Sequence, residues 1–165
     1  MTTTGAPTTP YSTYLGDRDP IAAIADTTAC IRALASPWPA PEYERTYAPG
    51  KWTARQILVH LAQSEIALGT RVRMALTVPN YAAQPFEQDR WLDLERTIAG
   101  PDALNAFLTL AAMNRSFFNS LPSAARQTTM THPEYGSISV DWVIHLIAGH
   151  QINHLLQLEE IGGSR

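Results

Sequence analysis

Apolar residues recur every three to four positions along four long stretches of the chain, the spacing of helices that bury one face. The first stretch follows Asp19-Pro20 and ends at Ser36-Pro37. An aspartate followed by proline is a favourable N-cap and first helical position. The second stretch begins at Thr53 and ends near Val78, and Thr53 with Gln56 matches a capping box.

The third stretch opens at Gly100-Pro101 and ends at Leu121-Pro122. The fourth begins after Ser139 or Asp141, either of which could cap it, and Gly162-Gly163 ends it. Between these stretches, three prolines in residues 37–41 predict a loop, because proline removes a backbone donor and restricts its neighbour. We expect a short helix in residues 87–94, and two short strands around a turn at residues 131–137.

Four amphipathic helices of about 15 to 25 residues, joined partly by long connections, predict an all-α protein with the architecture of a four-helix bundle. A chain of 165 residues is long enough for one substantial core and leaves little room for a second. The sequence therefore predicts a flexible Thr/Pro-rich leader in residues 1–19, one bundle domain in residues 20–161, and a short tail in residues 162–165.

Composition excludes several classes of function. The net charge is -3, and the twelve lysines and arginines are scattered, so we expect no nucleic-acid partner. No apolar run approaches the ~18 residues of a membrane span, and the first ten residues lack the features of a secretory signal, so we expect a cytoplasmic protein with no membrane partner. The single cysteine, Cys30, can form no internal disulfide, and the apolar pattern around it predicts a core position.

The most informative residues are two histidines in the fourth predicted helix. His150 and His154 are four positions apart, so their side chains lie on the same helix face and can converge on one ion. His60, in the second predicted helix, is a candidate third ligand. Three imidazoles leave coordination positions for water or a substrate, which is typical of a catalytic rather than a structural site. Both Zn²⁺ and Ni²⁺ accept such ligands.

Other polar residues near this set have less specific interpretations. His145 lies roughly 140° around the helix from His150, so we expect a structural role. His132 precedes Pro133 in the turn, where it could support the loop or line a pocket. Glu65 and Asn114 interrupt apolar stripes and could lie near the ion, although Glu65 could instead pair with an arginine such as Arg115 at a bundle edge.

One stretch, residues 47–62 (YAPGKWTARQILVHLA), resembles the start of the second helix in DinB-like proteins, particularly the YfiT branch related to bacillithiol transferases. Residues 71–77, residues 85–91, the turn at 132–136 and the terminal His150-x-x-x-His154 are similar to that branch in order and spacing. The resemblance covers about residues 20–161.

This resemblance implies a bundle of up-down-down-up connectivity, a nickel or zinc ion bound by His60, His150 and His154, and a homodimer. It also implies a thiol S-transferase, in which the ion activates a low-molecular-weight thiol toward an electrophile and residues 81–91 help to form the pocket. We identify no catalytic residue beyond the metal ligands.

Two alternatives remain open at this stage. The same ion could stabilise a binding module that turns nothing over. A metal-dependent hydrolase is the other alternative, but Gln151 stands where the metalloprotease motif H-E-x-x-H has its glutamate, and only Glu65 offers a general base from the helices.

Overall fold

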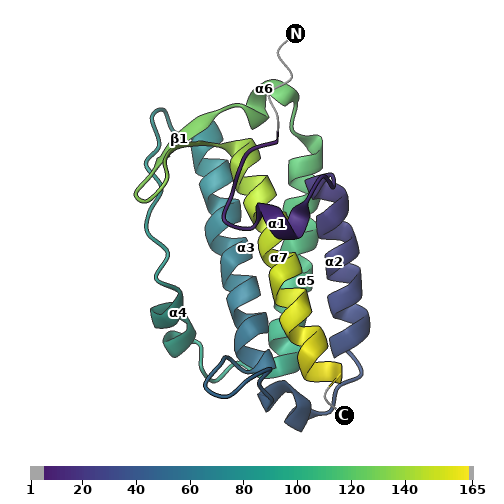
Figure 1. Cartoon of the computed structure of the whole chain (residues 1–165). Coiled ribbons are helices and arrows are strands. Elements are labelled where there is room, and N and C mark those ends of the chain that lie inside the picture. Colours follow the sequence, from purple (N-terminus) through teal and green to yellow (C-terminus); the bar gives the residue numbers. More distant parts are fainter. Residues whose placement is uncertain (1–5, 164–165) are drawn as a thin grey trace.

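The computed structural model describes residues 6–163, and four long helices dominate it (Figure 1). These are α2 (Pro20–Ala35), α3 (Ala54–Thr77), α5 (Gly100–Ser120) and α7 (Val140–Gly163). The shorter elements are α1 (Ser12–Leu15), the 3-10 helix η1 (Ala40–Glu44), α4 (Gln88–Leu94), α6 (Ser123–Arg126), β1 (Thr129–His132) and β2 (Gly136–Ser139). The prediction of an all-α four-helix bundle with two short strands is therefore confirmed.

The helix starts follow the local signals in the sequence. The Asp19 carboxylate accepts a hydrogen bond from the Ala22 amide at 2.8 Å. Thr53 and Gln56 exchange both bonds of a capping box, which fixes the first turn of α3. Ser139 Oγ accepts from the Trp142 amide at 3.0 Å, so Ser139 rather than Asp141 caps α7.

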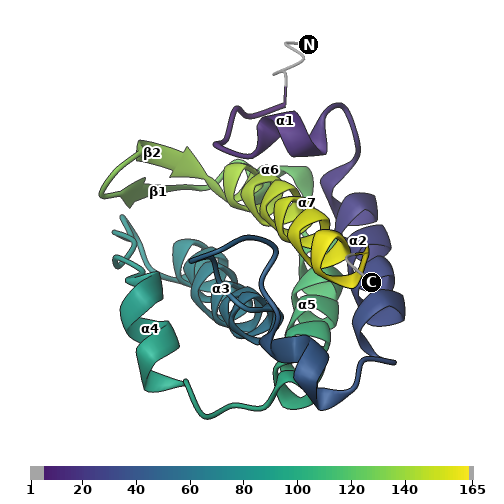
Figure 2. The same cartoon turned by 60° about the horizontal axis from the view of Figure 1, so that its bottom comes forward.

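The connectivity of the long helices is up-down-down-up. In Figure 1, α2 and α7 run toward the end of the bundle where the chain terminates, and α3 and α5 run the opposite way. The parallel pair α3 and α5 is joined by a long connection that contains α4 and passes outside α3 (Figure 2). As a result α3 and α7 are antiparallel neighbours, and this places residues from distant parts of the chain face to face.

The buried side chains form two clusters along the bundle axis. One is centred on Leu58, Phe107 and Leu158, and the other on Ile24, Phe118 and Ile144. Cys30 belongs to neither, because it is exposed, so its predicted core position is wrong. The physical reason is rotation along the helix: Cys30 lies about 120° from Ile24 and about 100° from Ile31, which puts it on the solvent side of α2.

The β-hairpin and the loop before α4 hold each other in place. Thr129 pairs with Ser139 and His132 with Gly136, whose φ of 68° suits glycine in the turn. Backbone bonds then join the loop to β1, from the Thr131 amide to the Tyr81 carbonyl at 3.0 Å and from the Ala83 amide to the Thr131 carbonyl at 2.8 Å. The hairpin and the loop therefore form one unit beside α3.

The segment before α2, within the leader predicted for residues 1–19, packs against α7. Leu15 is buried, and the Trp142 Nε1–H donates to the Thr8 carbonyl at 2.8 Å. These contacts are tertiary and leave no signal in the polar composition of the segment. Residues 1–5 lie outside the described residues, as do residues 164–165 of the predicted tail, while α7 continues through Gly163.

Gly149 is the point where this segment approaches α7 most closely, and it supports a first prediction. A Cβ at Gly149 would lie 2.5 Å from the Tyr11 carbonyl oxygen and 2.7 Å from Tyr11 Cβ. We expect Gly149→Ala to displace the segment and to lower the free energy of unfolding by about 1–3 kcal/mol. Chemical denaturation measures the loss, and limited chymotrypsin digestion measures exposure of Tyr11 and Tyr14.

Gly163→Ala is the matched control, because it lies in the same helix and nothing is within 4 Å of its added Cβ. The control should leave the digestion pattern unchanged. An equal digestion rate for both variants would show that Tyr11 is not held by the close approach at Gly149.

Among the described residues, no helix is both long enough and apolar enough to cross a membrane.

Candidate metal centre

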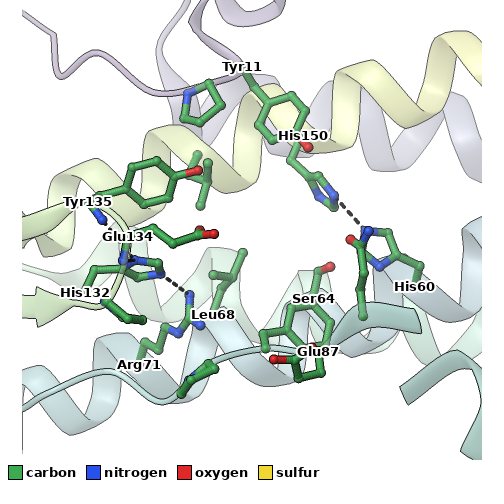
Figure 3. A pocket seen from close by; sticks show the side chains of 16 residues that line it. Tyr11, His60, Ser64, Leu68, Arg71, Glu87, His132, Glu134, Tyr135 and His150 are labelled. Atoms are coloured by element: carbon green, nitrogen blue, oxygen red, sulfur yellow. Dashed lines mark hydrogen bonds between the residues drawn. The ribbon is translucent and has the colours of Figure 1, made fainter. Parts of the chain in front are cut away.

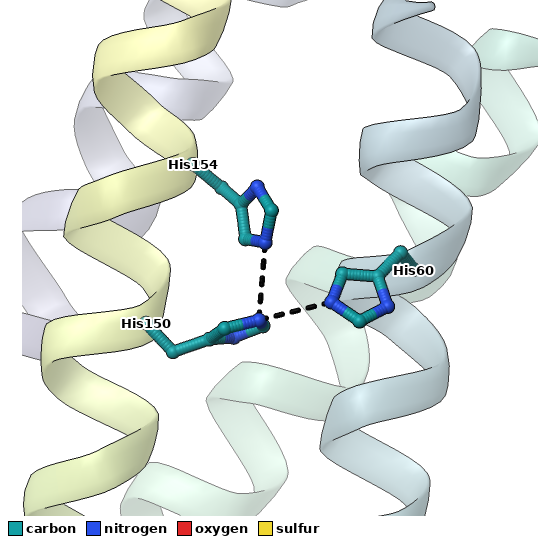
Figure 4. Close-up of side chains that lie close together, drawn as sticks. All are labelled: His60, His150 and His154. Atoms are coloured by element: carbon teal, nitrogen blue, oxygen red, sulfur yellow. Dashed lines mark hydrogen bonds between the residues drawn. The ribbon is translucent and has the colours of Figure 1, made fainter. Parts of the chain in front are cut away.

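Three histidine side chains meet between α3 and α7. His60 projects from α3, and His150 and His154 project from successive turns of α7 (Figure 4). His60 Nε2 lies 2.9 Å from His150 Nε2, and His154 Nε2 lies 3.0 Å from the same atom. Nitrogens bound at about 2.0–2.1 Å to one ion lie about 3 Å apart, so these separations match the donor set of a single ion.

The proton on His154 is placed by a neighbouring amide. His154 Nδ1 lies 2.7 Å from Gln157 Oε1. Because a carbonyl oxygen only accepts, Nδ1 carries the proton and Nε2 presents its lone pair toward the other two rings. Gln157 therefore has the position of a residue that orients a metal ligand.

Burial keeps all three rings neutral. Desolvation lowers the pKa of His60 to about 3 and that of His154 to about 4, and it lowers the pKa of His150 well below its ordinary value. Neutral imidazoles have available lone pairs, which metal binding requires. A neutral Nε2 has one proton or one lone pair, so His150 Nε2 can satisfy only one of its two close neighbours by hydrogen bonding. A cation would satisfy all three.

Aromatic side chains surround this cluster. The Trp52 ring centre is 4.9 Å from that of His60, the Phe86 ring stacks on His60 at 6.0 Å, and the Tyr11 ring meets His150 edge-on at 5.2 Å. His60 Nδ1 is buried without a hydrogen-bond partner. Among residues 6–163, no further histidine, cysteine or carboxylate completes the group. An ion bound here could therefore keep a position free for an exogenous ligand.

A cavity of about 430 Å³ begins at His60 and His150 and extends away along α3 (Figure 3). The segment before α1, the loop before α4 and the β-hairpin form its other walls, and of the expected residues 81–91 only residues 85–88 line it. Its lining residues are Pro10, Tyr11, His60, Ser64, Leu68, Arg71, Pro85, Phe86, Glu87, Gln88, His132, Pro133, Glu134, Tyr135, Leu146 and His150. A second cavity of about 290 Å³ reaches His154 beside Trp52 and Gln157.

Glu65 does not pair with Arg115, so that interpretation is wrong. Glu65 is buried and accepts hydrogen bonds from Asn114 Nδ2 at 2.8 Å and Gln151 Nε2 at 2.7 Å. Arg115 is exposed, because one residue along α5 rotates a side chain about 100° away from Asn114. Burial raises the pKa of Glu65, partly offset by these two bonds. The network ties α3, α5 and α7 together through Gln151, the residue that follows His150 in α7.

The other two histidines lie outside the cluster. His145 Nδ1 contacts the Asp141 carbonyl oxygen at 2.9 Å within α7, which agrees with a structural role. His132 both supports its turn and lines the large cavity. Sequence reasoning missed Arg71 and Tyr11 as lining residues. A signal for Arg71 existed, because His60, Ser64 and Arg71 follow at helical spacing along one face of α3.

The family model of the DinB superfamily matches residues 23–158. The chain belongs to the DinB superfamily. Among curated relatives, a candidate metal-dependent hydrolase of Oceanobacillus iheyensis is 28% identical over 121 residues, which cover 73% of this chain and 70% of the relative. A similarly named protein of Bacillus mycoides is 25% identical over 123 residues, with the same shares covered.

Two solved structures share the fold of this DinB-superfamily chain. YfiT from Bacillus subtilis, described as a probable metal-dependent hydrolase with an unusual four-helix bundle topology, matches with a TM-score of 0.78 at 21% identity, covering 86% of this chain and 83% of YfiT. A mycothiol-dependent maleylpyruvate isomerase matches with a TM-score of 0.71 at 14% identity, covering 84% of this chain and 59% of the isomerase chain. The recognition of a YfiT-like bundle is thus confirmed.

Proposed function

We propose that this protein is a metal-dependent thiol S-transferase, with a divalent ion, nickel or zinc, held by His60, His150 and His154. The observation that carries the proposal is the convergence of three Nε2 atoms at one end of a cavity of about 430 Å³. Three protein ligands and an adjoining cavity are the composition of a catalytic site.

The nucleophile must come from a bound small molecule. The only cysteine, Cys30, is exposed on α2 and is not among the residues that line either cavity. A divalent ion at the three histidines would lower the pKa of a bound thiol so that the thiolate exists near neutral pH. Gln157 orients His154, while Phe86 and Trp52 shield His60 from water. The structural neighbour that uses mycothiol supports a thiol as ligand.

A metal-dependent hydrolase is the second candidate, and the names of the curated relatives favour it. This reaction needs a general base near the ion. Glu65 is buried between Asn114 and Gln151 and does not line the cavity, so it is poorly placed for that role. Glu87 does line the cavity and is the better candidate for a base.

One set of assays separates these functions. Protein without an affinity tag is stripped of metal, reloaded with zinc or nickel, and tested for conjugation of small thiols to monochlorobimane and for hydrolysis of p-nitrophenyl esters. We expect reloading to accelerate conjugation by a low-molecular-weight thiol at least about 10-fold, because only a few per cent of a free thiol is thiolate at pH 7. Equal rates with and without metal would overturn the proposal.

The alternatives give different results in the same assays. Metal-dependent ester hydrolysis without conjugation would indicate the hydrolase, and a metal effect on melting temperature alone would indicate a binding module. A homodimer and a cytoplasmic location remain predictions; light scattering of the purified protein tests the first.

A further inference from the structure

Arg71 and His132 lie at the end of the large cavity opposite His60 and His150 (Figure 3). Both side chains are 7% exposed. Arg71 comes from α3 and His132 from the end of β1, so the cavity brings together a guanidinium and an imidazole that are 61 residues apart in sequence.

The hydrogen bonds within the turn determine which ring nitrogen of His132 carries the proton. His132 Nδ1 accepts hydrogen bonds from the Glu134 amide at 3.1 Å and the Tyr135 amide at 3.4 Å. A nitrogen that accepts has no proton, so the neutral ring carries its proton on Nε2. Burial and the neighbouring Arg71 charge lower the pKa of His132, which favours this neutral form.

Two donors therefore face each other. Arg71 Nη1 lies 3.3 Å from His132 Nε2, and both atoms carry hydrogen. Arg71 Nη2 donates to the Gln84 carbonyl at 2.7 Å, which fixes the guanidinium against the loop and leaves Nη1 directed at the ring. Buried donors without an acceptor are costly, so this pair is built to share an acceptor oxygen.

None of residues 6–163 supplies that oxygen. Glu134 lines the same cavity and acts on Arg71 through its charge, but its carboxylate forms no hydrogen bond or ion pair with Arg71 or His132. Glu87 also lines the cavity. The two nearby carboxylates repel a bound anion, and only one guanidinium attracts it. A singly charged anion is therefore repelled less than a doubly charged phosphate.

We propose that Arg71 and His132 form a subsite for the carboxylate of the ligand that occupies this cavity. One carboxylate oxygen accepts from Arg71 Nη1 and the other from His132 Nε2–H. His60 and Arg71 are eleven residues apart on nearly the same face of α3, a rise of about 16 Å. The ligand is accordingly an elongated acid whose carboxylate is several bonds away from its reacting atom. The identification of this acid as the substrate rests on the proposed function. The binding of its carboxylate at Arg71 and His132 is independent of that function.

Titration with butyrate, followed by the NMR signals of the His132 ring nitrogens, tests the subsite. The full chain is used both stripped of metal and loaded with zinc, and butyramide and inorganic phosphate are the comparison probes. We expect butyrate to shift the Nε2 signal in both forms and to bind roughly tenfold or more tightly than butyramide, because hydrogen bonds to a charged group are strong.

Three variants make the test specific. Arg71→Met removes the charge, and His132→Asn keeps an acceptor near the Nδ1 position for the turn while removing the Nε2 donor. Each should weaken butyrate binding roughly tenfold or more. Glu134→Gln removes the opposing charge and should strengthen it severalfold.

The butyrate titrations and the thiol-transfer assay can succeed or fail independently. Butyrate affinity unchanged by Arg71→Met and His132→Asn, or butyramide binding as tightly as butyrate, would overturn the subsite. Tighter binding of phosphate than butyrate would overturn the assignment to a carboxylate. Variant-sensitive butyrate binding in the metal-free protein, without any conjugation activity, would support the subsite while the proposed function fails.

Discussion

Replacing His150 with alanine should reduce metal affinity at least about 100-fold, because orienting contacts behind a ligand alone account for about 10- to 100-fold. His150 Nε2 lies 2.9 and 3.0 Å from the other two donors, so its loss removes both of these short separations. Elemental analysis of protein without a polyhistidine tag, followed by competition with a chelator, measures the change. Conjugation activity should fall in parallel if the ion activates the thiol.

Two further variants make this result interpretable. Gln157→Ala leaves all three ligands in place but removes the acceptor that fixes His154 Nδ1, so metal affinity should fall by an intermediate factor of about 10 to 100. His145→Ala lies in the same helix but outside the cluster, and it should leave metal content unchanged. His150→Gln keeps more of the buried volume in case the alanine variant unfolds. Full metal occupancy in both His150 variants would remove the basis of the proposed site.

The parts of the fold that the sequence predicted are those specified by a few adjacent residues. Asp19-Pro20, the Thr53 and Gln56 capping box and the glycine of the hairpin turn each fix local geometry through bonds between near neighbours. The common face of His150 and His154 is equally local, because helix geometry alone determines it. Only the packing of α3 against α7 brings His60 to them; the sequence offered His60 as a candidate, and the family resemblance supported that choice.

The contacts that the sequence did not predict have the opposite property, since each depends on which neighbour a helix face meets. Glu65 has a buried amide on each side, from α5 and from α7, and no local pattern distinguishes that arrangement from a pair with Arg115. The docking of Tyr11 over Gly149 is likewise tertiary. The pairing of Arg71 with His132 joins two elements whose relative position is set by the loop bonded to β1. Periodicity identified most helix faces but not their partners, and it misplaced Cys30, which lies on the solvent side of α2.

Acidification should destabilise the metal-free protein by several kcal/mol between pH 6.5 and pH 4.5. The unfolded chain has histidine pKa values near 6.5, whereas in the folded state burial lowers those of His60 and His154 to about 3 and about 4, and lowers that of His150 as well. The unfolded state therefore binds more protons in this range, so the free energy of unfolding is highest above pH 6.5 and falls as the pH drops.

The size of the effect follows from the same linkage. One ring that stays neutral over two pH units while its unfolded form is charged accounts for about 2–3 kcal/mol. The summed loss from three rings is comparable to the whole free energy of unfolding of a typical domain, which is about 5–15 kcal/mol. The lowered pKa of His132 acts in the same direction, and the raised pKa of the buried Glu65 carboxylate opposes it. We therefore expect the metal-free protein to unfold between about pH 4 and 5.

Urea unfolding of chelator-treated protein at several pH values measures this dependence, and His154→Gln provides the comparison. Removing one of the three titrating rings should reduce the slope by about a third between pH 6.5 and 4.5. Added zinc should shift the loss of stability to lower pH, because protons must then compete with the ion for the same lone pairs. A free energy of unfolding that stays constant from pH 7 to pH 5 in the metal-free protein would mean that the three rings are not held neutral by burial. The cluster would then be hydrated and open rather than preorganised for an ion.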